Sequence, residues 1–147
     1  MPLKNHYKPP TTVSPEIMNH IRNVICTMET PSWLTSVPAN FGDASAGTLK
    51  AAEWRALATV YLPVALVSLW GEGSTHATPE AACSAREVLD HTMLLISAAI
   101  LICYRSSALA RAQTFLDYLL AYTRDLGKIH KGVNHHPNHH MALHLCI

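Results

Sequence analysis

The sequence is short of charged side chains. Only 14% of its 147 residues are charged, while 49% are hydrophobic, and a typical soluble domain has about a quarter charged residues. The net charge is +1 and no basic run occurs, so no overall positive field favours nucleic acid. We expect either a compact helical core that needs few charges or an apolar surface that meets a partner.

A membrane span and the common enzyme motifs are also missing. The longest uncharged apolar run, residues 92–104, is shorter than the roughly 20 residues that span a membrane, so it predicts a buried core helix and no membrane partner. A membrane-peripheral bundle using residues 94–103 is the alternative. No apolar leader occurs, which predicts an intracellular protein. P-loop, GxGxxG and GxSxG motifs are absent, which argues against the usual nucleotide and acyl-hydrolysis sites.

The four cysteines are scattered, and no CxxC pair occurs. In a reducing compartment such thiols behave as small hydrophobic side chains. We expect Cys83 and Cys103 to lie on a buried helix, where the reactive thiolate is disfavoured. Structural cysteines are therefore the interpretation, and a nucleophilic thiol is not.

Helix signals dominate what is present. Ser14 and Thr78 each precede a proline and a glutamate, an order typical of a helix start. Pro63 interrupts an apolar helical stretch and predicts a kink or break near residues 61–62. Gly127 is well placed to follow the end of a helix. Further helix caps are expected at Thr48, at Ser106 or Ser107, and at Asn138.

No strand-like alternation and no internal repeat appear, so the fold class is all-α, an irregular helical bundle of about five helices with a long packed loop. Residues 1–13 are expected to form a disordered arm, and residues 14–147 a single helical domain. The loop, residues 31–47, is expected to pack down because it contains Trp33, Leu34, Val37 and Phe41. The core face expected for the helix after residue 107 comprises Leu109, Phe115, Leu116, Leu119, Leu120 and Tyr122.

Histidines cluster near the C-terminus. His140 and His144 are four residues apart, so on a helix they share a face, as two zinc ligands would. The third ligand is the weak point, with His136, Asp125 and Cys146 as candidates. One hypothesis is therefore a small metal-dependent enzyme, and the other interpretation is solvated or packed histidines. The cluster comprises His130, His135, His136, His139, His140 and His144.

Glu53, Trp54 and Arg55 follow one another on an otherwise apolar helix. They predict either a solvated edge with Trp54 packed inward or a buried ion pair that fixes the helix against a neighbour. Catalysis by Glu53 needs a second carboxylate, and Asp43 is the nearest in sequence. We do not expect a catalytic site here.

The amino-acid sequences of several segments resemble the C-terminal half of fungal CACTA-type transposases. The tail motif Pro-Asn-x-His-x-x-x-His, residues 137–144, is similar to the same family. What matches residue by residue is Glu53, Trp54, Arg55 and Pro63, together with His140 and His144. The matching segments are residues 31–34, 37–38, 42, 47–51, 53–55, 62–66, 69–71 and 137–145.

The resemblance implies a helical insertion within a ribonuclease-H-like transposase core that uses three carboxylates and divalent metal. Relatives carry an aspartate where this chain has Ala52, and their final glutamate is expected beyond Ile147, where this sequence ends. We therefore expect a transposon-derived helical domain, catalytically inactive by itself and without a cofactor of its own. Its expected partners are DNA or other transposase segments, in the nucleus. Self-association is expected through exposed Leu143, Leu145 and Ile147.

Overall fold

The computed structural model describes residues 14–104 and 108–146, and every regular element among them is helical. The all-α fold of about five helices is confirmed, while the predicted arm, residues 1–13, lies outside the described residues. The α-helices are α1 (Pro15–Thr27), α2 (Ala51–Ala56), α3 (Leu62–Trp70), α4 (Pro79–Ile102), α5 (Leu109–Ile129) and α6 (Pro137–Leu143). Shorter elements are the 3₁₀ turns η1 (Ala44–Ala46) and η3 (His144–Cys146) and the π-turn η2 (Leu57–Tyr61).

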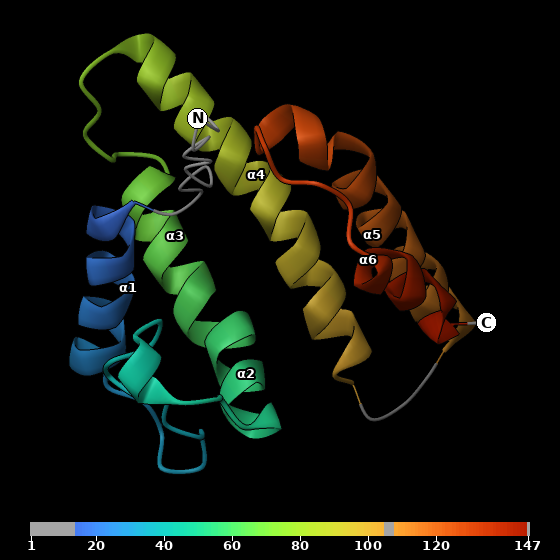
Figure 1. Cartoon of the computed structure of the whole chain (residues 1–147), viewed down its shortest axis with the longest axis horizontal. Coiled ribbons are helices and arrows are strands. Elements are labelled where there is room, and N and C mark those ends of the chain that lie inside the picture. Colours follow the sequence, from blue (N-terminus) through green and yellow to red (C-terminus); the bar gives the residue numbers. More distant parts are fainter. Residues whose placement is uncertain (1–13, 105–107, 147) are drawn as a thin grey trace, which may run out of the picture.

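The longest helix, α4, lies at the centre (Figure 1). It packs against α3 on one side and α5 on the other. Helix α1 covers the outer side of α3, and α6 rests on α5. The buried core helix predicted over residues 92–104 is confirmed in part, because Ile96 and Ala98 are buried while Leu95, Ile102 and Tyr104 are exposed.

Two predicted helix starts are confirmed by their capping hydrogen bonds. The Ser14 hydroxyl accepts from the backbone N–H of Ile17 at 3.4 Å. The Thr78 hydroxyl accepts from the backbone N–H of Ala81 at 3.1 Å. Each bond satisfies a donor that the first helical turn leaves without an intrahelical partner. The other expected caps at positions 106 and 107 lie outside the described residues.

Three other predicted boundaries were wrong. Helix α2 begins after Lys50 rather than at Thr48. Helix α6 begins after His136 rather than after Asn138, because Pro137 favours the first helical position and shifts the start. Helix α5 runs through Gly127, which has no positive φ and so continues the helix instead of ending it.

Pro63 changes the helix geometry without ending the helix. The elements α2, η2 and α3 follow one another without interruption over residues 51–70. The Leu62 N–H bonds to the Leu57 carbonyl five residues earlier, which is the π pattern. Proline has no N–H, and its ring crowds the carbonyl of Thr59, so a wider turn relieves the clash. The predicted departure from α-helical geometry is confirmed, and the predicted break does not occur.

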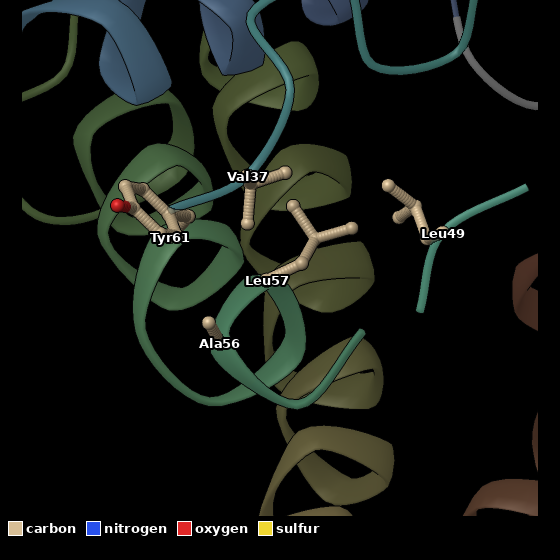
Figure 2. Packing of buried hydrophobic residues seen from close by; sticks show 5 residues of the cluster. All are labelled: Val37, Leu49, Ala56, Leu57 and Tyr61. Atoms are coloured by element: carbon tan, nitrogen blue, oxygen red, sulfur yellow. The ribbon is translucent and has the colours of Figure 1, made fainter. Parts of the chain in front are cut away.

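The first core cluster joins the loop to this helix (Figure 2). Leu57 is completely buried, and Val37 from the loop lies over it beside Tyr61. The packed loop is therefore confirmed for Val37, whereas Trp33 in the same loop is 81% exposed. The remaining buried members are Leu49 and Ala56, and Ile25, Met28, Leu34, Phe41, Val60 and Leu62 pack around them.

Two further clusters continue the core through α4. Leu66 of α3 meets Leu89 and Ile96 of α4. Ala98 of α4 meets Phe115 and Leu119 of α5. Because α4 contributes to both clusters, its second half connects the two sides of the bundle.

The predicted core face of the helix after residue 107 needs correction. Leu109 and Leu120 are exposed, whereas Leu126 is almost completely buried. Leu109 stands at the first residue of α5, before the helix meets α4. The last helix also differs from expectation, because Leu143 packs against the third cluster while Leu145 is exposed as expected. Position 147 lies outside the described residues.

The cysteine prediction is also wrong. Cys26 and Cys83 are exposed, and Cys103 is half-buried. Cys83 lies in the first half of α4, which faces solvent along most of its length.

One segment of the described residues is long and apolar enough to cross a membrane by length and composition, and it is Ala51–Trp70 rather than residues 92–104. Core helices of soluble proteins satisfy the same criterion. Only 28% of this segment's most apolar window is buried within the chain. Much of the helix surface is therefore left uncovered.

We predict that Leu57→Ala lowers the free energy of unfolding by about 2–5 kcal/mol, because it empties the centre of the first cluster. Leu109→Ala removes the same atoms from a side chain that is 88% exposed and should change stability by less than about 0.5 kcal/mol. Urea unfolding followed by circular dichroism measures both. Equal effects of the two variants would contradict the assignment of the core.

Candidate functional site

Glu53 acts on its own helix. Its carboxylate accepts from the backbone N–H of Lys50 at 2.6 Å, which is half of a capping box. The other half cannot form because a lysine side chain has no acceptor. Asp43 is engaged elsewhere, in an ion pair with Arg22 at 2.6 Å. The structure therefore does not bring Glu53 and Asp43 together.

Trp54 is not packed inward as one interpretation expected. It is 51% exposed and meets Phe41 edge to face, with ring centroids 6.2 Å apart. Such a contact contributes about 0.5–1.5 kcal/mol beyond area burial. Trp54 thus fixes the loop to the start of α2 while leaving one side of its ring in solvent.

Arg55 and Glu53 form no ion pair with any of the described residues, so the interpretation as a buried ion pair that fixes the helix against a neighbour is wrong. The Arg55 side chain is exposed and lines a groove of about 530 Å³ between the loop and the helix. We call this the Trp33 groove. Its lining residues are Trp33, Leu34, Thr35, Ala51, Ala52, Arg55, Ala56, Thr59 and Val60.

Most residues that line the Trp33 groove are apolar, and Thr35, Thr59 and Arg55 are the polar ones. Small side chains, Ala51, Ala52 and Ala56, form part of its lining, and Trp33 stands beside them. Arg55 adds the one charge among the lining residues. The position where the resembling family carries an aspartate, Ala52, therefore lies in this groove without a carboxylate.

Pro63, one of the residues that match the transposase-like pattern, is not among the residues that line the Trp33 groove. It is the second residue of α3 and determines the π-turn that includes Thr59 and Val60. Both of these residues line the groove. Pro63 therefore shapes the surface indirectly, through the backbone.

The histidine tail brings two of its three predicted ligands together. The Nε2 atoms of His140 and His144 lie 3.1 Å apart on the exposed side of α6. His136 lies at the other end of α6, where its backbone N–H donates to Nδ1 of His139. Asp125 is taken up by Arg124 and Lys128. Among the described residues no group of three or more histidine, cysteine or acidic side chains could hold a metal ion.

A second cavity, of about 420 Å³, lies between α5 and the tail. Burial lowers the pKa of His139, and nearby His136 and His135 lower it further. The protonated form of His139 is therefore disfavoured at this cavity. The cavity is lined by Leu120, Thr123, Arg124, His135, His136, His139, His140 and Leu143.

Sequence reasoning missed one polar centre altogether. His91 is 5% exposed inside α4, stacks on Tyr122 and bonds to His130. The only sequence signal was an isolated histidine inside an apolar helix. Such a side chain must find hydrogen-bond partners when it is buried.

We predict that Glu53→Ala destabilises the chain by about 1 kcal/mol, because it leaves the Lys50 N–H without its acceptor. Glu29→Ala removes an exposed carboxylate with no partner among the described residues and should be near neutral. Thermal unfolding of both variants checks the difference. If Glu53→Ala matches Glu29→Ala, the capping role is wrong.

Comparison of the chain with protein-family models, with curated proteins and with solved structures finds no match. The transposase-like resemblance therefore stays a prediction that rests on the quoted residues.

Proposed function

We propose that this chain is a transposase-like helical domain that acts by binding another protein segment and carries no catalytic chemistry of its own. The observation that carries the proposal is the exposure of Trp33 at the edge of an apolar groove. Tryptophan and arginine are the residues that most often dominate protein–protein contacts. Both are present here, on opposite elements of the same groove.

The groove has a rigid floor. Ala56 and Val60 belong to the helix that carries Leu57 and Tyr61 into the first core cluster. Leu34 lines the groove and also packs against that cluster. A partner would therefore meet a preformed surface, which reduces the ordering cost of binding.

Charge indicates the chemistry of the partner. Arg55 is an exposed guanidinium without an ion pair among the described residues, beside an apolar surface. An apolar segment that carries a carboxylate would bury its apolar side chains in the groove and pair with Arg55. If the transposase-like resemblance holds, another transposase segment is the expected source of such a partner. We therefore assign a protein segment, apolar and acidic, as the occupant.

DNA is a poorer fit to the same surface. The net charge is only +1, and phosphate binding needs several cations on one face. At least four of the basic side chains already face acids, because Arg22, Arg86, Arg124 and Lys128 are in ion pairs. Arg55 is the one charged residue among those that line the groove, and this matches a mixed apolar and acidic partner better than a phosphate backbone.

The absence of chemistry is supported by the carboxylates. Asp43, Asp90 and Asp125 each pair with a basic side chain, and Glu53 caps its helix. Phosphodiester cleavage by a two-metal site needs carboxylates that converge on the metals. No such convergence occurs within residues 14–104 and 108–146.

Selection from a displayed peptide library tests the proposal. Peptides enriched on the wild-type chain should combine aromatic or aliphatic residues with Asp or Glu. Their affinity should fall roughly tenfold or more for Trp33→Ala, as expected for a central interface residue. Arg55→Glu should shift the enriched peptides from acidic to basic, because the charge at the groove edge is reversed.

Leu109→Ala is the matched control, since Leu109 is equally exposed but lies at the start of α5. It should leave peptide affinity unchanged. Ala52→Asp adds a carboxylate within the groove, three residues before Arg55. It should weaken the binding of acidic peptides, because the new carboxylate pairs with that arginine. Peptides that bind Trp33→Ala as tightly as wild type would contradict the proposal. So would salt-dependent binding of duplex DNA that exceeds the binding of any selected peptide.

A further inference from the structure

A buried histidine pair connects the C-terminal segment to the core, away from the Trp33 groove. Nε2 of His91 lies 2.8 Å from the backbone oxygen of Tyr122, and Nδ1 lies 3.1 Å from Nε2 of His130. A carbonyl oxygen can only accept, so His91 carries its hydrogen on Nε2 and leaves Nδ1 as the acceptor. His130 must then donate from Nε2. The hydrogen-bond partners thus assign one tautomer to each ring.

We propose that the His91–His130 pair is an acid-sensitive contact that holds residues 130–146 against the helical core and releases them as the pH falls. A proton added to Nδ1 of His91 would remove the acceptor and turn two N–H groups toward each other. It would also place a charge on a side chain that is almost completely buried, which is costly without a counter-ion.

Among the described residues no counter-ion faces the pair. The elements that pack against α4 are α5, α3 and the π-turn. Helix α3 and the π-turn carry no charged side chain, and their titratable group is Tyr61. On α5, Tyr122 stacks on His91 with centroids 4.6 Å apart. The charged residues near that end of α5, Arg124, Asp125 and Lys128, pair with one another.

The groups on neighbouring positions do not supply a counter-ion either. On α4 itself, Asp90 pairs with Arg86 at 3.2 Å, and Glu87 is exposed. Lys131, next to His130, is exposed. The tail contributes His139, whose ring meets the edge of Tyr122 at a centroid distance of 6.3 Å. A proton on the pair would therefore add a positive charge at a place where the neighbouring titratable side chain is another histidine, His139, and not a carboxylate.

The titration of the second histidine has the matching sign. Burial lowers the pKa of His130, and nearby His91 lowers it further. The unfolded chain therefore takes up a proton near the ordinary pKa of 6.5 before the folded chain does. The stabilising contribution of the neutral pair is present above about pH 6.5 and is lost as the pH falls below it.

The contact matters because the tail has few other attachments. No residue of α6 is buried. The tail rests on α5 through Ala142 and Leu143 and through the ring of His139. His130 is the residue at which the chain leaves α5. Loss of its contact with His91 would therefore free the tail at the point where the tail begins.

Hydrogen–deuterium exchange of the full chain tests the proposal, with rates corrected for the intrinsic effect of pH. Between pH 7.5 and 5.5, protection of residues 131–146 should fall measurably relative to α1, because the unfolded segment takes up a proton before the folded one does. His91→Gln keeps a donor and an acceptor but cannot take up a proton, so it should remove most of that dependence. His76→Gln, on the loop before α4, should behave like wild type.

Two results would overturn the proposal: protection of residues 131–146 that does not change in wild type, or the same pH dependence in His91→Gln. Imidazole ¹⁵N spectra of wild type give a second test that needs no variant. At pH 7.5 both rings should be the Nε2–H tautomer, and His130 should titrate below 6.5. An Nδ1–H tautomer at His91, or titration of His130 at 6.5 or above, would contradict it.

Discussion

The Ala51–Trp70 helix determines how the rest of the chain is arranged, and its π-turn determines which side of that helix is buried. Leu57, Tyr61 and Ala65 are four residues apart and all buried. In a regular α-helix a spacing of four residues drifts about 40° per step around the axis. The wider turn ahead of Pro63 offsets that drift. One face thus stays against the loop, α1 and α4 over the length of the helix.

The same helix and its loop also leave large apolar side chains exposed. Val64 and Val67 of α3, Trp54 of α2 and Trp33 of the loop are all exposed. Exposed apolar side chains on this scale are typical of surfaces that bind a partner. The low charge content of the sequence therefore has its counterpart on the surface, and we interpret that surface as the functional part of the domain. The His91–His130 pair lies on the other side of α4 and concerns the tail alone.

Local signals predicted local structure in part, since the caps at Ser14 and Thr78 formed while those expected at Thr48 and Asn138 did not. Ser14 and Thr78 were correct because a cap and its first turn lie within four residues of each other. Pro63 predicted the right place for irregular backbone, but whether the helix breaks or widens depends on packing that the sequence does not display. Leu109 and Leu120 were assigned to the core because helical spacing cannot tell a two-sided helix from a one-sided one. The fold class followed from the sequence, and the faces of the helices did not.

The candidate site was less predictable, since it depends on meetings between distant residues. Trp33 and Arg55 are far apart in sequence and come together only through the packing of Val37 on Leu57. His91 and His130 are separated by 39 positions, and no sequence pattern around either residue indicates that the two meet. The predicted tail ligands fared better only where spacing alone sufficed, as for His140 and His144, which do meet on one face.

We propose that the chain functions by binding another protein segment and catalyses no reaction by itself. Incubation of the purified chain with supercoiled plasmid and Mg²⁺ or Mn²⁺, followed across the final purification column, tests it most directly. The account predicts that the plasmid stays supercoiled in every fraction that contains the chain. Nicked or linear product whose amount follows the chain through the column, and which disappears with EDTA, would contradict it.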